Sequence, residues 1–177
     1  MRWVWRIALL VVLVLVAAGM FVALTARPKL DDAKDAAAAR WKVVATPLAA
    51  RYTALAVLSE AVAATGDEER PVVRDVKRSL RAWERDRASG TPAAVRAAND
   101  LEGGARRLLA AIAASDRLDA SKEVLAARDA FTKASIPPSS AAYNRAVADY
   151  EKEREGTVKR LVADLMGYDA LPIFDST

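Results

Sequence analysis

The chain has 177 residues, enough for one domain with a membrane segment beside it, and its 27 Lys and Arg against 23 Asp and Glu give a formal net charge of only +4. It contains no Cys and no His, which excludes disulfides, thiolate zinc sites, Cys nucleophiles and every mechanism that uses an imidazole. Hydrophobic residues make up 53%, and Ala alone fills 40 positions. Because Ala is the best helix former and is depleted in strands, the composition favours an all-α fold.

The first expected element is an N-terminal transmembrane helix. Residues 7–26 carry no charge and consist mainly of Val, Leu and Ala. At a rise of about 1.5 Å per residue, such a run spans the roughly 30 Å hydrocarbon core of a bilayer. Trp3 and Trp5 precede the run, as suits the interfacial belt of a membrane protein. The sequence therefore predicts a single-pass anchor over residues 1–28 that contacts membrane lipid in the plasma membrane.

A cleaved signal peptide is the alternative to a retained anchor. A basic start and an apolar run fit both, and Val16-Ala17-Ala18 is acceptable as a cleavage signal. The apolar run nevertheless continues to Ala26, beyond the length of a signal-peptide core. Length therefore favours the anchor.

The positive charges around the anchor do not decide its orientation. Arg2 and Arg6 lie densely on the near side, while a larger number of cations lies on the far side. The far-side cations are Arg27, Lys29, Lys34, Arg40 and Lys42. The density of the first pair favours, by a narrow margin, an extracytoplasmic position for the rest of the chain.

Beyond the anchor, apolar residues recur at helical spacing. The expected stripes are Leu30, Ala37, Trp41 and Val44; Leu48, Tyr52, Leu55, Leu58 and Val62; Val73, Val76, Leu80 and Trp83; Val95, Ala98, Leu101, Ala105, Leu108 and Ile112; Val124, Leu125 and Phe131; and Tyr143, Val147, Tyr150, Val158, Leu161 and Leu165. Breaks are expected at Thr65-Gly66, Ser89-Gly90, Ser115-Asp116, Pro137-Pro138 and Gly167. At Thr46-Pro47 either a new helix begins or one long helix is kinked. The pattern predicts an elongated antiparallel bundle of four-helix type over residues 29–177.

Several short motifs within this bundle resemble those of one known family. They are Trp41, Arg51-Tyr52 and Leu58; Leu101, Gly103 and Arg106-Arg107-Leu108; Leu118 and Val124-Leu125; and Tyr143-Asn144, Ala146-Val147, Asp149-Tyr150, Gly167-Tyr168 and Phe174. In these residues the chain resembles the LemA family of bacterial membrane-anchored helical proteins. The resemblance covers most of residues 41–174 and implies a bundle of long antiparallel helices. It brings no established catalytic residues.

The chain departs from the family pattern at four places. Ala56-Val57 stands where the family has Pro-Asn, and Ser115-Asp116-Arg117-Leu118 replaces its Tyr-Pro-Asp-Leu turn. Ser140 stands where an Arg is expected three residues before the Tyr-Asn pair. Ile136-Pro137-Pro138 interrupts a final helix that is long in the family. The chain is therefore identified as a divergent member.

The aromatic residues of the stripes are expected to lie in the core. Trp41, Tyr143 and Tyr150 occupy stripe positions, and a helical aromatic stripe usually faces the interior. A buried Tyr hydroxyl needs a partner, for which Asn144 or Arg51 would serve. The alternative is that Tyr143 and Asn144 form a recognition surface together.

A basic face is the feature of the sequence that most suggests binding. Arg70, Arg74, Lys77, Arg78, Arg81 and Arg85 recur at spacings of three, four and seven, opposite an apolar stripe, and so share one side of a helix. Asp75, Glu84 and Asp86 flank this face and are expected to leave its centre unneutralised. The face is either solvated only or docks on anionic lipid or an acidic partner. Nucleic acid is not expected, because aromatic interleaving and binding motifs are missing.

The acidic clusters predict no metal site. Asp31-Asp32-Asp35, Asp67-Glu68-Glu69 and Glu151/Glu153/Glu155 lack the calcium-loop pattern and are interleaved with Lys and Arg. We therefore expect no catalytic residue, cofactor or metal. The sequence favours a non-enzymatic scaffold at the membrane with one or more protein partners, and the alternative is a membrane-surface module that uses the basic face to bind or remodel lipid.

Overall fold

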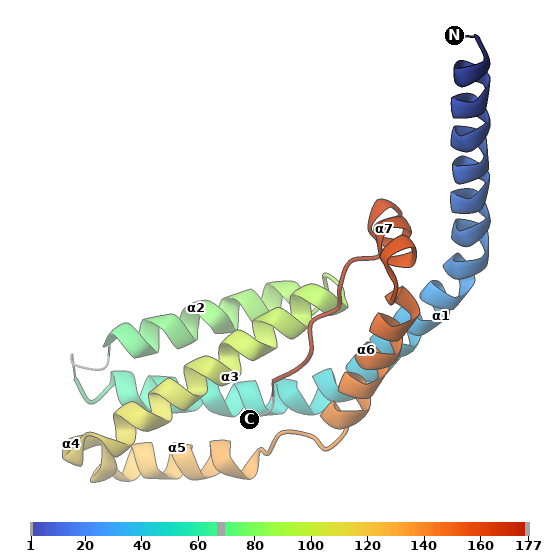
Figure 1. Cartoon of the computed structure of the whole chain (residues 1–177). Coiled ribbons are helices and arrows are strands. Elements are labelled where there is room, and N and C mark those ends of the chain that lie inside the picture. Colours follow the sequence, from blue (N-terminus) through green and yellow to red (C-terminus); the bar gives the residue numbers. More distant parts are fainter. Residues whose placement is uncertain (1, 67–69, 176–177) are drawn as a thin grey trace. The chain divides into compact units, whose positions relative to one another are not determined.

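The computed structural model describes residues 2–66 and 70–175, and within these ranges all regular secondary structure is helical (Figure 1). This confirms the all-α prediction. The helices are α1 (Arg2–Ala63), α2 (Arg70–Asp86), α3 (Thr91–Ala113), α4 (Asp116–Asp119), α5 (Lys122–Lys133), α6 (Ser140–Arg154) and α7 (Thr157–Leu165). The acidic residues 67–69 lie outside the described part.

The chain forms two compact units, each assembled from separate stretches of sequence. The first unit contains Met1–Ala37 and Arg145–Leu171, and the bundle unit contains Ala38–Asn144 and Pro172–Thr177. The helices α1 and α6 contribute residues to both.

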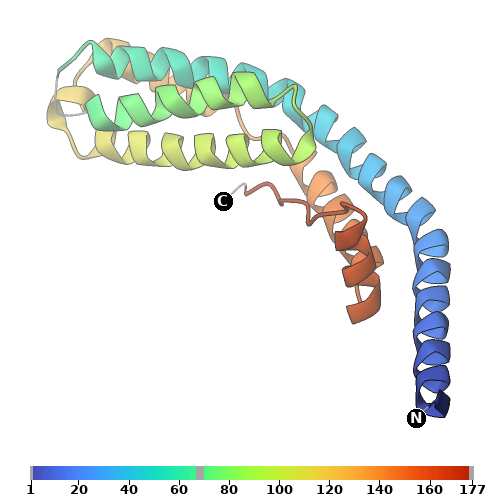
Figure 2. The ribbon, with the colours of Figure 1, turned by 90° about the horizontal axis from the view of Figure 1, so that it is seen from above.

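The bundle unit is built from four helical segments that lie side by side with alternating directions. They are the part of α1 after Ala38, then α2, α3 and α5, as the two views show together (Figures 1 and 2). Its core consists of the predicted stripes, except for Leu80 and Leu125, which are only partly buried. All of Trp41, Val44, Leu48, Tyr52, Leu55, Leu58, Val62, Val73, Val76, Trp83, Val95, Ala98, Leu101, Ala105, Leu108, Ile112, Val124 and Phe131 are buried. Burial of one stripe per helix holds the bundle together, because a single helix cannot remove its own apolar face from water.

Local chemistry fixes where the bundle helices begin and approach one another. The Oγ atoms of Ser115 and Ser121 accept from the backbone N–H groups of Leu118 and Val124, which caps α4 and α5. Gly104 faces α2 without a side chain, and a Cβ atom there would lie 3.4 Å from Cγ2 of Val76. The glycine therefore permits a close approach of α2 and α3.

The first unit contains α7 and the turn that ends it. The backbone N–H groups of Tyr168 and Gly167 donate to the carbonyl oxygens of Ala163 and Asp164 at 2.9 and 3.2 Å, and Gly167 has a φ of 79°. This is the Schellman arrangement, which favours glycine at that position. It confirms that Gly167 ends the last helix. The hydroxyl of Tyr168 then donates to Oδ1 of Asp31 in the same unit.

The structure decides between two open alternatives for one helix and corrects an expectation about another. The helix α1 continues through Thr46-Pro47, so no new helix begins there, and the Thr46 hydroxyl donates to the Lys42 carbonyl oxygen instead of capping. The last stripe is interrupted at Gly156, whose φ is 107°. Leu161 and Leu165 are consequently not core residues, since 62% and 80% of their surfaces are exposed.

The expected membrane span falls on residues 7–26, whose backbone lies in α1 but whose side chains are outside the described ones. Within the part of the chain that is described, none of the helices combines the length and the hydropathy that crossing a bilayer requires.

Candidate functional site

One group of polar residues surrounds a short segment of the bundle unit. Residues 172–175, which we call the strap, have no helical structure and lie against Asn99, Tyr143 and Asn144, which we call the clasp. The Tyr143 hydroxyl donates to the carbonyl oxygen of Pro172 at 2.7 Å. The clasp therefore joins α3 and α6 to a segment that the chain reaches much later.

The two asparagines hold opposite sides of the strap backbone. Asn144 donates from Nδ2 to the carbonyl oxygen of Phe174 and accepts at Oδ1 from its N–H, both at 2.9 Å. Asn99 donates to the carbonyl oxygen of Ile173 and accepts from the N–H of Asp175, again at 2.9 Å. Hydrogen bonds that alternate in this way are those of an extended β-strand between two neighbours. Each amide side chain therefore makes the two hydrogen bonds that a neighbouring strand would make.

The side chain of Phe174 completes the contact between strap and bundle. It is 1% exposed, and its ring centroid lies 5.8 Å from that of Trp41. Trp41 also contacts Tyr143, with ring centroids 5.1 Å apart. Both ring pairs are tilted, with interplanar angles of 58°, and aromatic contacts other than a face-to-face sandwich add stability beyond the buried area. Nε1 of Trp41 is buried and has no hydrogen-bond partner among the described residues.

Burial shapes the acid–base chemistry of the tyrosines. It raises the pKa of Tyr143 well above the ordinary value for a phenol. The pKa of Tyr52 is also raised, first by burial and then by the charge of Glu102, and its hydroxyl donates to the carbonyl oxygen of Ala98. Burial raises the pKa of Tyr150 to about 12, and its hydroxyl donates to the carbonyl oxygen of Asp169. The expected partners Asn144 and Arg51 were wrong, because all three hydroxyls bind main-chain carbonyls.

A second polar cluster lies around Arg51 in the same unit. Its guanidinium binds both carboxylate oxygens of Glu102, at 2.8 and 3.0 Å, and the two side chains are only 11% and 6% exposed. Nη1 also donates to the carbonyl oxygens of Phe131 and Ala134 at the end of α5, and the guanidinium carbon lies 4.0 Å from the centroid of the Phe131 ring. Arg51 therefore joins α1, α3 and α5 through one side chain.

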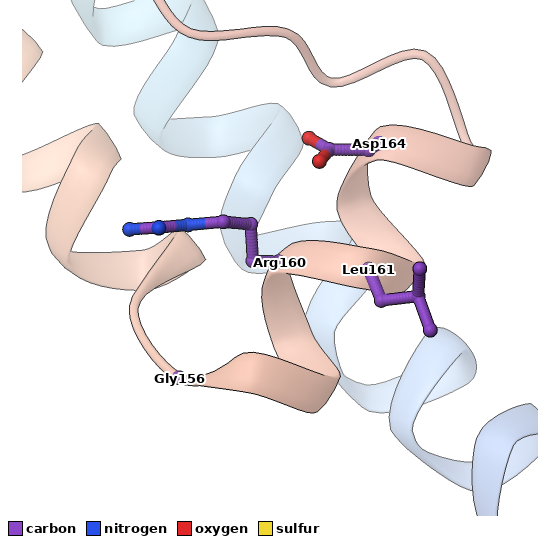
Figure 3. A pocket seen from close by; sticks show the side chains of 4 residues that line it. All are labelled: Gly156, Arg160, Leu161 and Asp164. Carbon is purple, nitrogen blue, oxygen red and sulfur yellow. The ribbon is translucent and has the colours of Figure 1, made fainter.

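The first unit contains a further polar cluster, around Arg154. Its guanidinium binds Glu151 at 2.7 Å and Asp164 at 2.6 Å. Asp164 also lines an open depression of about 480 Å³ with Gly156, Arg160 and Leu161 (Figure 3). In this view Arg160 and Leu161 point away from one another. These side chains do not converge on a point where a substrate would be held.

The predicted basic face lies on α2, where Arg74, Arg78, Arg81 and Arg85 are exposed and Lys77 is partly buried. The side chain of Arg70 is outside those described. A shallow groove of about 350 Å³ borders this face between α1 and α2, and Arg81 and Tyr52 belong to its lining. The cations thus share one helix and face solvent, as the spacing indicates.

Acidic neighbours pair with three of the five described cations of this face. Lys77 binds Glu60 at 2.8 Å, Arg78 binds Asp75 at 3.2 Å and Arg85 binds Asp86 at 2.8 Å. The hydrogen bond from Arg85 lowers the pKa of Asp86. The expectation that the flanking acids leave the face unneutralised was therefore wrong for Asp75 and Asp86. Arg74 and Arg81 make no ion pair with any residue that the structure describes.

Comparison with known families places these clusters in a family context. The family described as LemA family matches residues 40–177, which is more than half of the chain. The chain belongs to the LemA family. The match confirms the resemblance, and it contains every residue of the clasp, the strap and the Arg51 cluster. No curated protein and no solved structure matches the chain.

The departures from the LemA pattern fall on identifiable parts of the structure. Val57, in place of the family's Asn, is 56% exposed on α1. Ser115 caps α4, so the altered turn still starts a helix. Ser140 is buried at the start of α6, and Pro137-Pro138 lie in the connection between α5 and α6. The clasp and the Arg51 cluster include none of these positions.

Sequence analysis found Trp41, Arg51, Tyr52, Leu101, Tyr143, Asn144, Tyr150, Gly167 and Phe174 but missed their polar partners. Glu102 and Asn99 are the most important of these. Glu102 follows the buried Leu101, and Asn99 follows the buried Ala98, so both lie beside the stripe of α3. A polar residue directly after a core residue indicates a side chain at the edge of the core. This pattern does not indicate which residue it binds.

Proposed function

We propose that this LemA family member is a non-enzymatic scaffold, anchored in the plasma membrane by residues 1–28, which presents the helical bundle within residues 29–177 to other proteins. The observation that supports the proposal is that polar side chains inside the bundle bind other parts of the same chain. Arg51, Tyr52, Tyr143 and Asn144 all bind main-chain groups of the same chain. Side chains engaged in this way stiffen a body and do not supply reacting groups to a cleft.

The anchor is supported by the uncharged run of residues 7–26, whose backbone is helical within α1. We expect the full-length protein to stay in membranes after an alkaline carbonate wash. The matched control replaces Leu13 and Leu15 by Arg, since each Arg at the centre of a span costs about 2.5–3.5 kcal/mol. Release of the wild type, or a mature chain that begins near Gly19, would contradict the anchor.

For the orientation, the density of Arg2 and Arg6 favours, by a narrow margin, a bundle outside the cytoplasm. Protease added to intact spheroplasts should then digest the bundle. A protected bundle that becomes sensitive only after lysis would reverse the orientation and leave the anchor in place.

The scaffold role requires a protein on the surface of the bundle. Val43 and Val57 are exposed apolar residues of α1, and each is suited to a site-specific photo-crosslinker. In native membranes we expect at least one of these positions to give a discrete cross-linked band of higher mass. A crosslinker at buried Val44 is the control that should give none.

A membrane-surface role for α2 is the second candidate, supported by the exposure of Arg74 and Arg81 without ion pairs among the described residues. Each cation near an anionic surface contributes about 1 kcal/mol. A fluorophore on Ala88→Cys, in full-length protein in nanodiscs, should be quenched by a headgroup quencher when anionic lipid is present. Replacing Arg74, Arg78, Arg81 and Arg85 by Gln should abolish this quenching. Equal quenching with neutral lipid would show that the face is solvated only.

A further inference from the structure

The strap is held mainly through its backbone. Five of its main-chain groups, on Pro172, Ile173, Phe174 and Asp175, hydrogen-bond to the three side chains of the clasp. The side chain of Ile173 contributes little, since 61% of its surface is exposed. The clasp therefore recognises extended backbone, as a sheet edge does when a peptide adds to it as a strand.

Two strap side chains add selectivity. Phe174 is buried against Trp41, so the clasp requires a large apolar side chain at this position. Nη2 of Arg106 lies 3.5 Å from Oδ2 of Asp175, which favours an acidic residue next along the segment. The hydrogen bond of Pro172 uses its carbonyl oxygen, so its missing N–H costs nothing there.

We propose that the clasp is a binding site for extended peptide segments of the form Pro-x-Phe-Asp, and that residues 172–175 of a second copy of this chain occupy it in exchange for the chain's own strap. The site is complementary to that segment by construction, because the same four residues already fill it. The second copy would be one partner of the scaffold, so this proposal rests on the proposed function. If the exchange does not occur, the proposals of a membrane anchor and of other contact surfaces are unaffected.

The exchange is a competition between identical segments. The chain's own strap has the advantage of an effective concentration in the millimolar range for short connections. A second copy competes when chains are crowded, and exchange of an identical element then links two chains.

The binding site is tested on the full-length chain in detergent with Phe174→Ala, which removes the aromatic contact of the resident strap. A fluorescent peptide with the sequence of residues 170–177 should bind this variant at least tenfold more tightly than the wild type, whose own strap competes. The same peptide with Phe replaced by Ala should not bind. Adding Asn144→Ala should weaken binding at least tenfold, whereas adding Lys122→Ala, an exposed change on α5, should not. Equal affinity for wild type and variant, or for both peptides, would overturn the proposal.

The exchange between copies is tested without disturbing Phe174. Because the chain has no Cys, single cysteines report contacts unambiguously. Full-length Arg106→Cys and Asp175→Cys chains, mixed and treated with a short bismaleimide, should give cross-linked dimers that excess peptide abolishes. The control pairs Asp175→Cys with Lys133→Cys, a position whose side chain is 77% exposed on α5. Dimer yields equal to that control would refute the exchange in trans.

Discussion

The polar interior of the bundle unit and the basic face of α2 contain similar residue types but use them in opposite ways. In the interior, Arg51 binds a carboxylate 51 positions away that is itself buried. On α2, Arg78 and Arg85 bind acids three positions and one position away, respectively, at the surface. The interior contacts join separate helices, whereas the pairs of Arg78 and Arg85 stay within one helix, and on this face only Lys77 reaches another helix among the described residues, through Glu60 of α1. Stability should therefore depend on the interior contacts, and the cations of α2 should be almost dispensable for folding.

Removing Glu102 should give the largest effect. Glu102→Ala leaves the charge of Arg51 buried without its partner, which typically costs about 3–5 kcal/mol of unfolding free energy. Urea denaturation of the full-length protein in detergent measures this loss. The matched control is Glu84→Ala, which removes the exposed partner of Arg87 and should change stability by less than about 0.5 kcal/mol. Similar losses of unfolding free energy in both variants would contradict the claim that interior contacts stabilise the fold more than surface ion pairs.

Substitutions in the clasp should give the second-largest loss of unfolding free energy. Asn144→Ala deprives the N–H and C=O groups of Phe174 of their partners, and unpaired buried groups cost about 1–3 kcal/mol. Asn99→Ala should cost less, because its bonds are more exposed and water can replace them. The same denaturation experiment ranks the two. A larger loss for Asn99→Ala would contradict the assigned burial of the clasp.

Alkaline pH should weaken the interior specifically. The pKa values of Tyr52, Tyr143 and Tyr150 are raised in the folded state, so their stabilisation is complete below the unfolded value near 10 and is lost as pH rises. For Tyr150, with a pKa of about 12, the loss by pH 11 should be about 1 kcal/mol. Denaturation at pH 8 and 11 measures it, and Tyr150→Phe should reduce the difference. An unchanged free energy of unfolding at pH 11 would refute the burial of these hydroxyls.

The smallest effect is expected on α2. Replacing Arg74, Arg78, Arg81 and Arg85 by Gln keeps helix propensity and leaves the apolar stripe intact, so the free energy of unfolding should change by less than about 0.5 kcal/mol. Circular dichroism and urea denaturation check this at low and high salt. A loss comparable to that of Glu102→Ala would show that the basic face takes part in folding.

The sequence predicted the core of the bundle well because helical periodicity alone determines which residues share a face. The stripe from Val95 to Ile112 is buried at every position. The same argument failed for Leu161 and Leu165, since Gly156 adopts a φ of 107° and interrupts the helix on which that stripe depended. The spacing of apolar residues does not reveal where a helix is interrupted. The glycine itself has to be recognised as a helix break.

The partners of the polar residues could not be predicted, because they are distant in sequence. Tyr143 and Asn144 were recognised through the family resemblance, but their contacts with residues 172–175 depend on how α6 and the strap meet. Asn99 reaches a carbonyl 74 positions away. Local patterns contain no information on such pairings, and only the folded arrangement reveals them.

Hydrogen exchange at two amides tests most directly whether the clasp holds the strap as two substitute strands. The N–H groups of Phe174 and Asp175 donate to Asn144 and Asn99 respectively. In the wild type, NMR should show both amides exchanging at least tenfold more slowly than in the free peptide. Asn144→Ala should accelerate hydrogen exchange at the Phe174 amide more than at the Asp175 amide. Asn99→Ala should accelerate exchange more at Asp175 than at Phe174. Exchange of both amides at free-peptide rates in the wild type would contradict the account.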